Sequence, residues 1–330
     1  MESKYIVITG GLGFIGSNLV AQLEKEGYTN IIIADAFGCD DKWKNIAKRQ
    51  CDIDIIHPDA LFVTLDTISA NLLSVVHLGA ISSTTETNVD HLRETNYKLS
   101  VNIFEWCRSH SIQFIYASSA SVYGSHNIFE DSDNPLDIRE LLPLNAYGWS
   151  KKTVDYYIAN KGGFSNPESK TVALRFFNVY GPNEYHKGSQ SSVIYHFFNQ
   201  IEQTGKVSLF KSTVEKIEDG EQKRDFVYVA DCTTLICWLI KNQHISGIFN
   251  VGTGQAKSFN EVAATIFEEL HKAINIEYIE MPKIIQRHYQ NFTEANIKKL
   301  KVNGYPYPFR SLEEGIKDYI SILTHQDQYI

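Results

Sequence analysis

The chain has 330 residues, of which 43% are apolar and 21% charged, and its formal net charge is −8. This composition excludes a disordered or fibrous chain, and the length allows about two domains with a sizeable core. Acidic residues outnumber basic ones, 39 to 31, so no basic excess points to nucleic acid. No run of about 18 apolar residues indicates a membrane span. Five cysteines without a CxxC pair, and a start without an apolar leader, favour a reducing, cytoplasmic location.

Short β-branched runs alternate with segments of helical period through the first half of the chain. The runs predict strands at Tyr5–Thr9, Ile31–Asp35, Ser74–Leu78, Gln113–Ser118 and Thr171–Phe177. After the third run, Leu92, Leu99, Ile103 and Trp106 recur near helical spacing and predict an amphipathic helix that covers one face of a sheet. This alternation predicts an α/β fold of the Rossmann type, a doubly wound parallel sheet with right-handed crossovers.

The alternation becomes irregular after Asn178, where the turn residues Gly181 and Pro182 open a second region. Its predicted elements are a helix at Ser192–Gln203, a strand at Val207–Phe210, a polar insertion at Ser212–Gln222, and helices at Thr293–Leu300 and Ser311–Leu323. Asp225–Val229 and Gly247–Val251 look like strands that return to the first sheet. We therefore expect a dinucleotide-binding Rossmann domain at 1–178 plus about 223–251, and a smaller, mixed α/β substrate-binding domain at 179–222 plus about 252–330.

A glycine-rich turn follows the first predicted strand, with Gly10, Gly13 and Gly16 in the spacing GxxGxxG. A dinucleotide pyrophosphate needs a main chain without a Cβ in its way and the positive end of a helix dipole, which this turn supplies. A turn that is tight only for packing would look similar. Asp35 ends the second strand, where its carboxylate would bind a ribose and favour NAD. The cations that follow either offset a 2′-phosphate or form a solvated face: Lys42, Lys44, Lys48 and Arg49.

A tyrosine and a lysine four residues apart, Tyr147 and Lys151, share one face of a helix capped near Asn145. Upstream, Ser119 ends a strand at the carboxyl edge of the sheet, where ligands of open α/β folds bind. The cluster allows proton transfer coupled to hydride transfer. Lowering the pKa of a tyrosine by ~3 units requires roughly 4 kcal/mol, which Lys151 and an oxidised nicotinamide would supply. Ser119 would hold the substrate oxygen.

The glycine turn, Ser119, Tyr147 and Lys151 together resemble the extended short-chain dehydrogenase/reductase family of nucleotide-sugar enzymes, the NAD-dependent epimerases and dehydratases. Further blocks resemble the ADP-heptose 6-epimerases of that family, and the likeness spans nearly the whole chain. The blocks are Ile81–Glu86, Phe176–Pro182, His186–Ser189, Arg224–Val229 and Tyr289–Thr293. The third block is the sharpest marker, whereas the second and fourth are shared widely among sugar-nucleotide enzymes.

The resemblance implies an isomerase that inverts C6 of an ADP-bound heptose through a transient 6-keto sugar, in lipopolysaccharide heptose synthesis. It implies Tyr147 as one acid/base and Lys187 as the second, with Lys151 and Ser119 completing the catalytic set. From spacing alone, Lys187 would more often be a solvated lysine. The resemblance further implies bound NADP, with NAD as the alternative, ADP-heptose as substrate, a homo-oligomer of pentamer type, and no metal, membrane or nucleic-acid partner.

The same resemblance assigns contacts on both sides of the site. Cofactor contacts are Gly10, Gly13, Phe14, Ile15, Gly16, Asp35, Ala36, Lys42, Leu78, Gly79, Ala80, Ile81, Ser82, Asn96, Lys151, Val179 and Lys187. Substrate contacts are Ser82, Asn178, Ser189, His196, Phe210, Arg224 and Tyr289. A guanidinium such as Arg224 can grip a diphosphate, although an ion pair with Asp225 is the structural alternative. The family has an acid where this chain has Leu78 and a lysine where it has His57, which leaves cofactor preference open.

Other functions stay open beside epimerisation at C6. A 4,6-dehydratase needs a carboxylate after the strand that ends in Ser118 and Ser119, and none is there. A UDP-hexose 4-epimerase or another nucleotide-sugar oxidoreductase shares the Ser, Tyr and Lys set, and Lys187 separates it from the 6-epimerases. The insertion at Ser212–Gln222 leaves the sugar and nucleotide open in detail. A non-catalytic dinucleotide-binding scaffold is the remote alternative, because such proteins tend to lose the tyrosine or the lysine.

Overall fold

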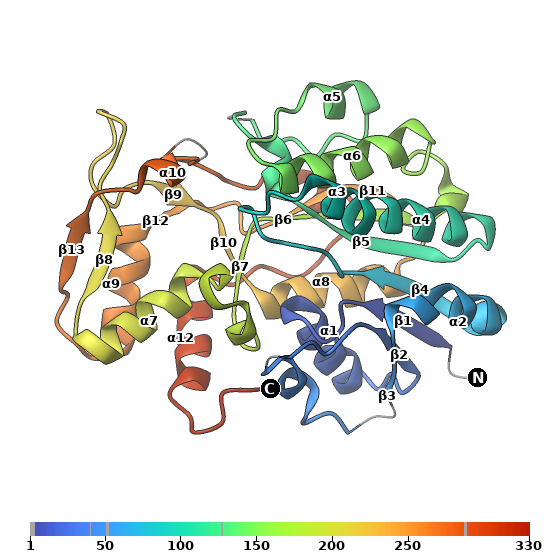
Figure 1. Ribbon diagram of the computed structural model, residues 1–330, viewed down its shortest axis with the longest axis horizontal. Helices are drawn as coiled ribbons and strands as arrows, with labels where there is room; N and C mark the ends of the chain where they lie inside the picture. Colours follow the sequence, from blue (N-terminus) through green and yellow to red (C-terminus); the bar gives the residue numbers. More distant parts are fainter. Residues whose placement is uncertain (1–3, 40, 51–52, 127, 287–288) are drawn as a thin grey trace.

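The computed structural model describes residues 4–39, 41–50, 53–126, 128–286 and 289–330. A seven-stranded parallel sheet runs through it in the order β11-β6-β5-β4-β1-β2-β3 (Figure 1). Its strands are β1 (Tyr5–Thr9), β2 (Ile31–Ala34), β3 (Ile53–Ile56), β4 (Leu72–His77), β5 (Gln113–Ser119), β6 (Thr171–Phe176) and β11 (Gly247–Val251). The strand order reverses between β1 and β4, so the carboxyl ends of these two strands open the crevice where such sheets bind ligands. The expected doubly wound α/β fold is confirmed.

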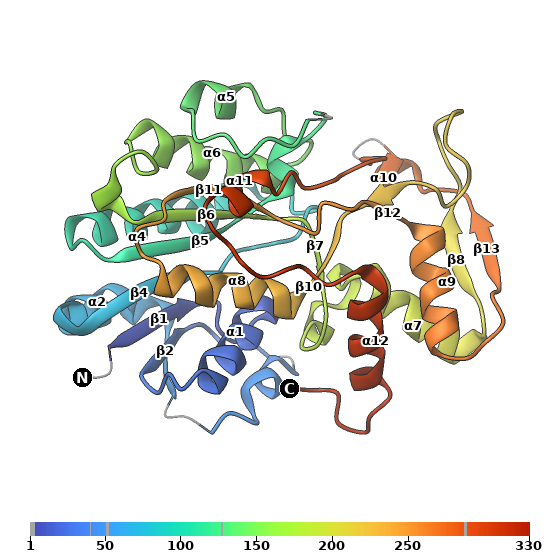
Figure 2. The ribbon, with the colours of Figure 1, turned by 180° about the vertical axis from the view of Figure 1, so that it is seen from behind.

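Helices cover both faces of the sheet, as Figures 1 and 2 show. On one face lie α1 (Phe14–Lys25), α8 (Val229–Lys241) and α11 (Lys298–Val302). On the other lie α2 (Leu61–Ile68), α4 (Leu99–Ser109) and α6 (Ala146–Asn160). The central strands are therefore buried on both sides, which is why β1 reads as a nearly unbroken apolar run in which Ile6, Val7 and Ile8 are fully buried.

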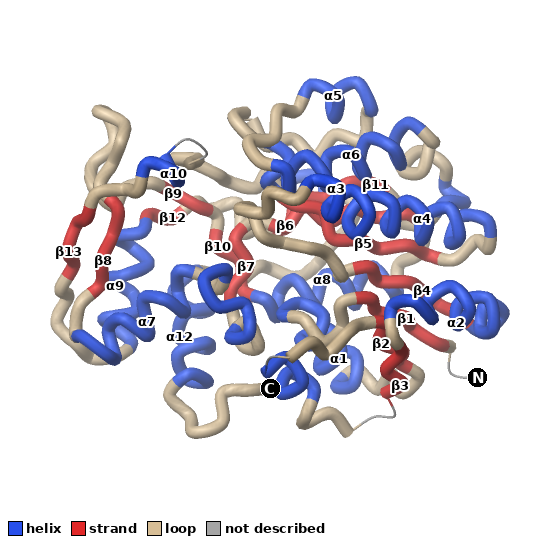
Figure 3. The backbone as a smooth tube through the Cα atoms, in the orientation of Figure 1, coloured by secondary structure: helices blue, strands red, loops and turns tan. Residues whose placement is uncertain are grey.

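A second region lies beside the sheet, on the left in Figure 3. It contains α7 (Val193–Thr204), α9 (Phe259–Glu269), α12 (Leu312–Leu323) and the parallel pair β8 (Val207–Phe210) and β13 (Ile276–Ile279), around a core of its own. The remaining short elements are α3 (Val89–Leu92), α5 (Pro135–Glu140), α10 (Lys283–Gln286), β7 (Asn178–Tyr180), β9 (Lys223–Arg224), β10 (Phe226–Tyr228) and β12 (Lys257–Ser258). We propose the two domains expected from the sequence, with the difference that Phe226 and Tyr228, which the sequence places in the first domain, pack in this second core.

The expectation that Asp225–Val229 returns to the main sheet is wrong. β10, within this segment, pairs with β7 in a separate two-stranded sheet. The free edge of β6 is already occupied by β11, whose Gly247–Val251 pair with Val172–Phe176, as expected for that segment. The outer edge of β11 is in turn met by side chains, because the N–H groups of Ile248 and Asn250 donate to the carboxylates of Asp133 and Asp131.

The predicted helix at Thr293–Leu300 is also wrong in its first half, because α11 begins at Lys298. The backbone N–H of Thr293 donates to the carbonyl of Lys223, and that of Ala295 to the carboxylate of Asp225. These groups find partners on another segment, which replaces the helical bonds. The sequence reasoning also missed β3, a four-residue edge strand that contains an exposed Asp54.

Membrane-spanning helices and metal-binding clusters are both absent from the part of the chain that the structure describes. No helix there has both the length and the apolar character needed to cross a bilayer. No group of three or more His, Cys, Asp or Glu side chains there is placed to hold a metal ion. Four cysteines are free thiols, Cys39, Cys107, Cys232 and Cys237, and Cys51 lies outside the described residues.

Candidate active site

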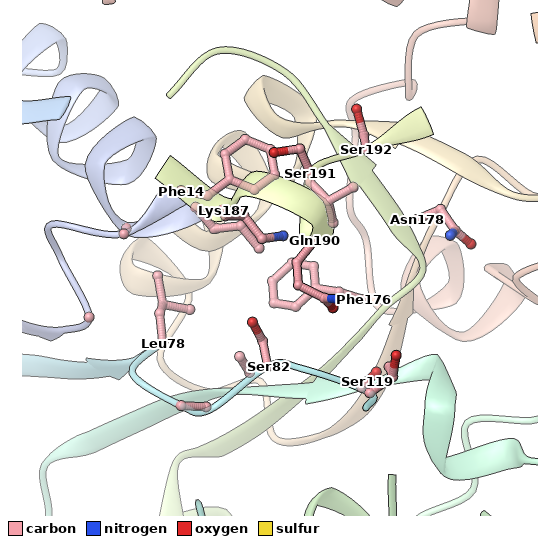
Figure 4. Close-up of a pocket in the computed structure, with 18 of the residues that line it drawn as sticks. Phe14, Leu78, Ser82, Ser119, Phe176, Asn178, Lys187, Gln190, Ser191 and Ser192 are labelled. Carbon is pink, nitrogen blue, oxygen red and sulfur yellow. The ribbon is translucent and has the colours of Figure 1, made fainter. Parts of the chain in front are cut away.

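A cavity of about 630 Å³ lies at the carboxyl ends of the parallel strands. It is lined by the turn after β1 and the ends of β4, β5 and β6, and by a loop that precedes α7. Figure 4 shows Phe14 and Lys187 on one side of it, with Ser82 and Ser119 on the other. All four predicted catalytic residues line this one cavity: Ser119, Tyr147, Lys151 and Lys187.

The three glycines of the first turn have different physical reasons to be glycine. A Cβ on Gly10, which has a φ of +70°, would lie 2.5 Å from the backbone nitrogen of Gly79, and one on Gly16 would lie 2.2 Å from the carbonyl oxygen of Gly10. A Cβ on Gly13 meets only the Gly10 oxygen, at 3.2 Å. Gly10 and Gly16 are therefore needed for close packing, and Gly13 begins α1 at the cavity wall.

The start of α1 fits the pyrophosphate of a dinucleotide. Gly13 is its N-cap, no side chain caps it, and no acidic residue lies in its first turn. Its first N–H groups and the positive end of the helix dipole therefore face a cavity without a competing carboxylate from this helix. The chemistry of the turn is that of an anion site.

Alanine at position 16 is expected to destabilise the fold by about 1–3 kcal/mol, because its Cβ would overlap the backbone of the turn rather than a flexible side chain. Cofactor affinity should fall with it. Urea unfolding monitored by circular dichroism measures the change. Gly13→Ala is the matched control, because its Cβ meets a single atom, at 3.2 Å rather than 2.2 Å, and should cost less stability. A Gly16→Ala protein no less stable than Gly13→Ala would contradict this assignment.

Asp35 lies at the cavity wall beside the end of β2. Its carboxylate accepts hydrogen bonds from the backbone N–H of Leu12 at 3.0 Å and of Ala36 at 2.7 Å, and pairs with Lys42 at 2.7 Å. Of the four cations that follow Asp35, only Lys42 lines the cavity. The other three form ion pairs elsewhere: Lys44 with Asp41, Lys48 with Asp327, and Arg49 with Glu24. Lys42 therefore stays the candidate cation for a bound phosphate, and the other three do not line the cavity.

The segment after β4 forms another wall, made of Leu78, Gly79, Ala80 and Ser82. Ile81 stands behind it, together with Asn96, and neither lines the cavity. The Asn96 side chain accepts from the Ile81 N–H and donates to the Ile81 carbonyl, both at 2.9 Å. Asn96 also donates to the hydroxyl of Ser150, next to Lys151. It lies in a π-helical segment, Arg93–Lys98, between α3 and α4, a kind of turn that is frequent at functional sites.

Tyr147 and Lys151 project from α6, whose first turn is capped by the Asn145 side chain. Burial raises the pKa of Tyr147, and a hydrogen bond with Ser119 opposes this. The Lys151 ammonium donates to the carbonyl of Ala117 at 2.7 Å, and its expected effect on the phenol stays a prediction for the cofactor-bound protein. Burial lowers the pKa of Lys151 to about 8, and the charge of Asp155 opposes that shift.

Asp155 is a buried carboxylate that the sequence reasoning missed. It forms an ion pair of 3.0 Å with Arg175, and both side chains are almost completely buried. It also accepts hydrogen bonds from the hydroxyls of Tyr116 and Ser118. It thereby ties α6 to β5 and β6. The available signal was its position one helical turn after Lys151 on the same face.

Lys187 lies in the short helical loop Tyr185–Gln190, and its ammonium stands 5.4 Å from the centroid of the Phe14 ring. Burial lowers the pKa of Lys187, and the negative charge of Glu184 opposes this. The side chain of its neighbour His186 contacts Asn45 at 3.2 Å. Lys187 is therefore not the solvated lysine that spacing alone would favour.

The predicted substrate side is only partly in the cavity. Ser82 and Asn178 line it, as does Val179 of the predicted cofactor set, whereas the others of the substrate set do not: Ser189, His196, Phe210, Arg224 and Tyr289. Ala36 of the predicted cofactor set also stands outside the lining. His57 is exposed and caps a short helical turn rather than facing the cavity.

Arg224 stands just behind the cavity wall. Its guanidinium lies 5.0 Å from the ring centroid of Tyr289 and 5.9 Å from that of Phe259, which lines the cavity. Burial lowers its pKa. No ion pair of Arg224 occurs among the described residues, because Asp225 instead accepts from the backbone of Thr253, Gly254 and Ala295. The structural alternative for Arg224 is therefore wrong.

The cavity is also lined by residues to which the sequence analysis assigned no contact, although some of them lie in the blocks it named. They are Thr84, Ala117, Ser118, Ser121, Phe176, Phe177, His186, Gln190, Ser191, Ser192, Val193, Phe226 and Phe259. Most are neighbours of named residues, and the run from Gln190 to Val193 directly follows the block that contains Lys187. That adjacency was the signal that could have found them.

Comparisons with known proteins agree with this geometry. The model of the NAD dependent epimerase/dehydratase family matches residues 6–252. The chain is 41% identical to an ADP-L-glycero-D-manno-heptose-6-epimerase of Fusobacterium nucleatum, over 98% of this chain and 100% of the relative. A crystal structure of the Helicobacter pylori ADP-L-glycero-D-manno-heptose-6-epimerase is similar with a TM-score of 0.81 and 30% identity, covering 97% of this chain and 96% of that one.

A UDP-N-acetylglucosamine 4-epimerase of Methanobrevibacter ruminantium is also similar, with a TM-score of 0.81, 25% identity and coverage of 97% of this chain and 98% of that one. The shared fold therefore extends to enzymes that act at another carbon of another sugar. The match to the family model and the identity to full-length relatives, however, lead to one conclusion. The chain belongs to the NAD dependent epimerase/dehydratase family.

Proposed function

We propose that this chain interconverts ADP-D-glycero-β-D-manno-heptose and ADP-L-glycero-β-D-manno-heptose by inverting C6, in lipopolysaccharide heptose synthesis. One observation carries the proposal: Tyr147 and Lys187, from separate elements, line the same cavity. Tyr147 is on the side of Ser119, to which it is hydrogen-bonded, and Lys187 is on the side of Phe14. C6 lies outside the sugar ring, so it can turn in place and present each face to a different proton-transfer group. The named relatives support the same activity.

Each catalytic residue has a defined task in this proposal. Ser119 donates a hydrogen bond to the C6 oxygen, and Tyr147 removes the hydroxyl proton as C6 is oxidised to a ketone. A bound nicotinamide would accept the C6 hydride and return it to the opposite face of the ketone, and in its oxidised form it would carry a positive charge that favours the phenolate. Lys151, on the same helix as Tyr147, adds a second positive charge that also favours the phenolate. After the ketone turns its other face, Lys187 protonates the oxygen in the opposite orientation. The sugar ends with no net oxidation.

We infer that the resident cofactor is NADP. Lys42 neutralises Asp35 at the cavity wall and offers a cation near the place of a ribose 2′-phosphate. Leu78 adds no negative charge there.

We also propose that the protein forms a homo-oligomer, a pentamer by family resemblance, and that it is located in the cytoplasm. Sedimentation velocity tests the first, and fractionation of cells tests the second.

The proposed function is tested by incubating purified protein with ADP-D-glycero-β-D-manno-heptose and following the C6 configuration by NMR. We expect a mixture of both epimers and, in the nucleotide released by denaturing the same preparation, the mass of NADP. Unchanged substrate while the cofactor is bound would refute the activity. Conversion of a UDP-hexose at C4 instead would support the 4-epimerase alternative. Release of NAD would show that the bound cofactor is NAD and not NADP.

A further inference from the structure

The loop that carries Lys187 is closed by one buried side chain, Glu184, which is completely inaccessible to solvent. One oxygen of its carboxylate accepts from the Gly181 N–H at 3.2 Å and from the Ser192 hydroxyl at 2.7 Å. The other oxygen accepts from the Ser192 N–H. Gly181 and Ser192 are the two ends of the loop, so a single carboxylate joins them.

The main chain of Glu184 adds two further bonds inside the loop. Its carbonyl accepts from the Lys187 N–H at 3.0 Å and from the Ser191 hydroxyl at 3.1 Å. The segment enclosed by these bonds supplies His186, Lys187, Gln190, Ser191 and Ser192 to the cavity. Glu184 itself does not line the cavity, although it determines where these side chains stand.

Glu184 is also the nearby negative charge that acts on Lys187. The Lys187 ammonium rests against the Phe14 ring, and no ion pair of Lys187 occurs among the described residues. Burial alone favours a neutral amine, and the charge of Glu184 opposes this. The carboxylate therefore has a structural and an electrostatic connection to the same lysine.

We propose that Glu184 is a positioning residue for the epimerisation proposed above, which fixes the Lys187 loop and supplies the negative charge that keeps the Lys187 ammonium protonated. The loop bonds hold the lysine at the cavity, and the charge ensures that it has a proton to give to the C6 oxygen. Only the expected change in the epimerisation rate rests on the proposed function. The effect on Lys187 itself is measurable without substrate.

Other titratable groups around this pair contribute a background that a change at position 184 leaves in place. Asp35 and Lys42 line the same cavity as a mutual ion pair, and His186 contacts Asn45. Two further titratable side chains, Tyr147 and Lys151, line the cavity together with Lys187. The titratable side chains near Glu184 are Tyr185, next to it in the chain, and Tyr319, on α12. Burial raises the pKa values of both tyrosines, and the Glu184 charge raises them further.

Glu184→Gln keeps the shape of the side chain and removes its charge. Because the charge favours the ammonium, its removal lowers the pKa of Lys187, and the lysine loses its proton at lower pH. We expect the alkaline limb of the epimerisation rate to move down by roughly one pH unit. The modification of Lys187 by cyanate, followed by peptide mass spectrometry, should have its midpoint moved by the same amount in the absence of any sugar.

Ser192→Ala is the matched control, because it removes one loop-closing bond, together with the N-cap bond from Tyr195, and leaves the Glu184 carboxylate in place. It should change the rate without moving either midpoint. A double-mutant cycle adds a second readout: in a Lys187→Met background, Glu184→Gln should cost much less of the remaining rate than it does alone.

The outcomes separate the two proposals. Midpoints in Glu184→Gln equal to those of the wild type would overturn the electrostatic role, even if the rate fell as in Ser192→Ala. A moved cyanate midpoint in a protein that converts no heptose would refute the proposed function and leave the action of Glu184 on Lys187 intact. If Glu184→Gln does not fold, Glu184→Asp retracts the charge by one methylene, and an unmoved midpoint there would overturn the inference.

Discussion

Replacement of Tyr147 by Phe is expected to lower the epimerisation rate by about 10²–10⁴-fold, the usual contribution of a positioned proton-transfer group. The change removes the hydroxyl that bonds to Ser119 and keeps the ring that lines the cavity. The nicotinamide should therefore remain bound. NMR of the C6 configuration gives the rate, and the nucleotide released on denaturation gives the cofactor content.

Tyr156→Phe, on the same helix but outside the cavity lining, is the control for the loss of a phenol hydroxyl. It should retain the wild-type rate. Near wild-type epimerisation by Tyr147→Phe would show that another group takes the C6 proton, and the catalytic assignment built on α6 would fall.

Lys187→Met is expected to lower epimerisation by a similar factor, about 10²–10⁴-fold, because methionine has nearly the same length and no proton to give. Proton transfer by Tyr147 remains, so one orientation of the substrate can still be oxidised. We therefore expect one epimer to reduce part of the bound oxidised nicotinamide without conversion to the other epimer. The absorbance of the reduced nicotinamide measures this step, and NMR of the C6 configuration measures the missing conversion.

Lys301→Met, an exposed lysine of α11, controls for the loss of a cation far from the cavity. Full activity in Lys187→Met would contradict the two-group mechanism. It would favour a reaction in which Tyr147 alone transfers protons, as in the 4-epimerase alternative.

Much of the site could be predicted because it depends on local sequence. A glycine turn after a β-branched run, an acid at the end of the next strand, and a tyrosine and lysine one helical turn apart are short-range patterns. Gly13, Asp35, Tyr147 and Lys151 accordingly line one cavity. Lys187 has no such local pattern, and only the family resemblance singled it out.

Residues that act through distant partners were not predictable in this way. Asp155 forms its ion pair with Arg175, twenty residues away on a neighbouring strand. Glu184 accepts hydrogen bonds from backbone groups at both ends of a loop. A buried carboxylate looks in the sequence like any exposed one, because burial is decided by tertiary packing. The hydrogen bond from the Lys151 ammonium to the Ala117 carbonyl was missed for the same reason, because helical spacing gives the face of a side chain and not its tertiary partner.

Strand pairing was predictable only where one partner was available. Asp225–Val229 and Gly247–Val251 are both short apolar runs in the second half of the chain, and either could have extended the sheet beyond β6. Only β11 does. Both segments are far from β6 in the chain, and each could pair with its free edge. The local sequence pattern does not say which of them does.

The late position of β11 has a consequence for the order in which the nascent chain can fold. β6 receives its outer neighbour only at Gly247–Val251, and α1 is covered by α8 at Val229–Lys241. As the polypeptide leaves the ribosome, the first 178 residues therefore carry an open sheet edge and a bare apolar helix face until some seventy more residues have emerged. Chaperone capture during translation should concentrate in that interval.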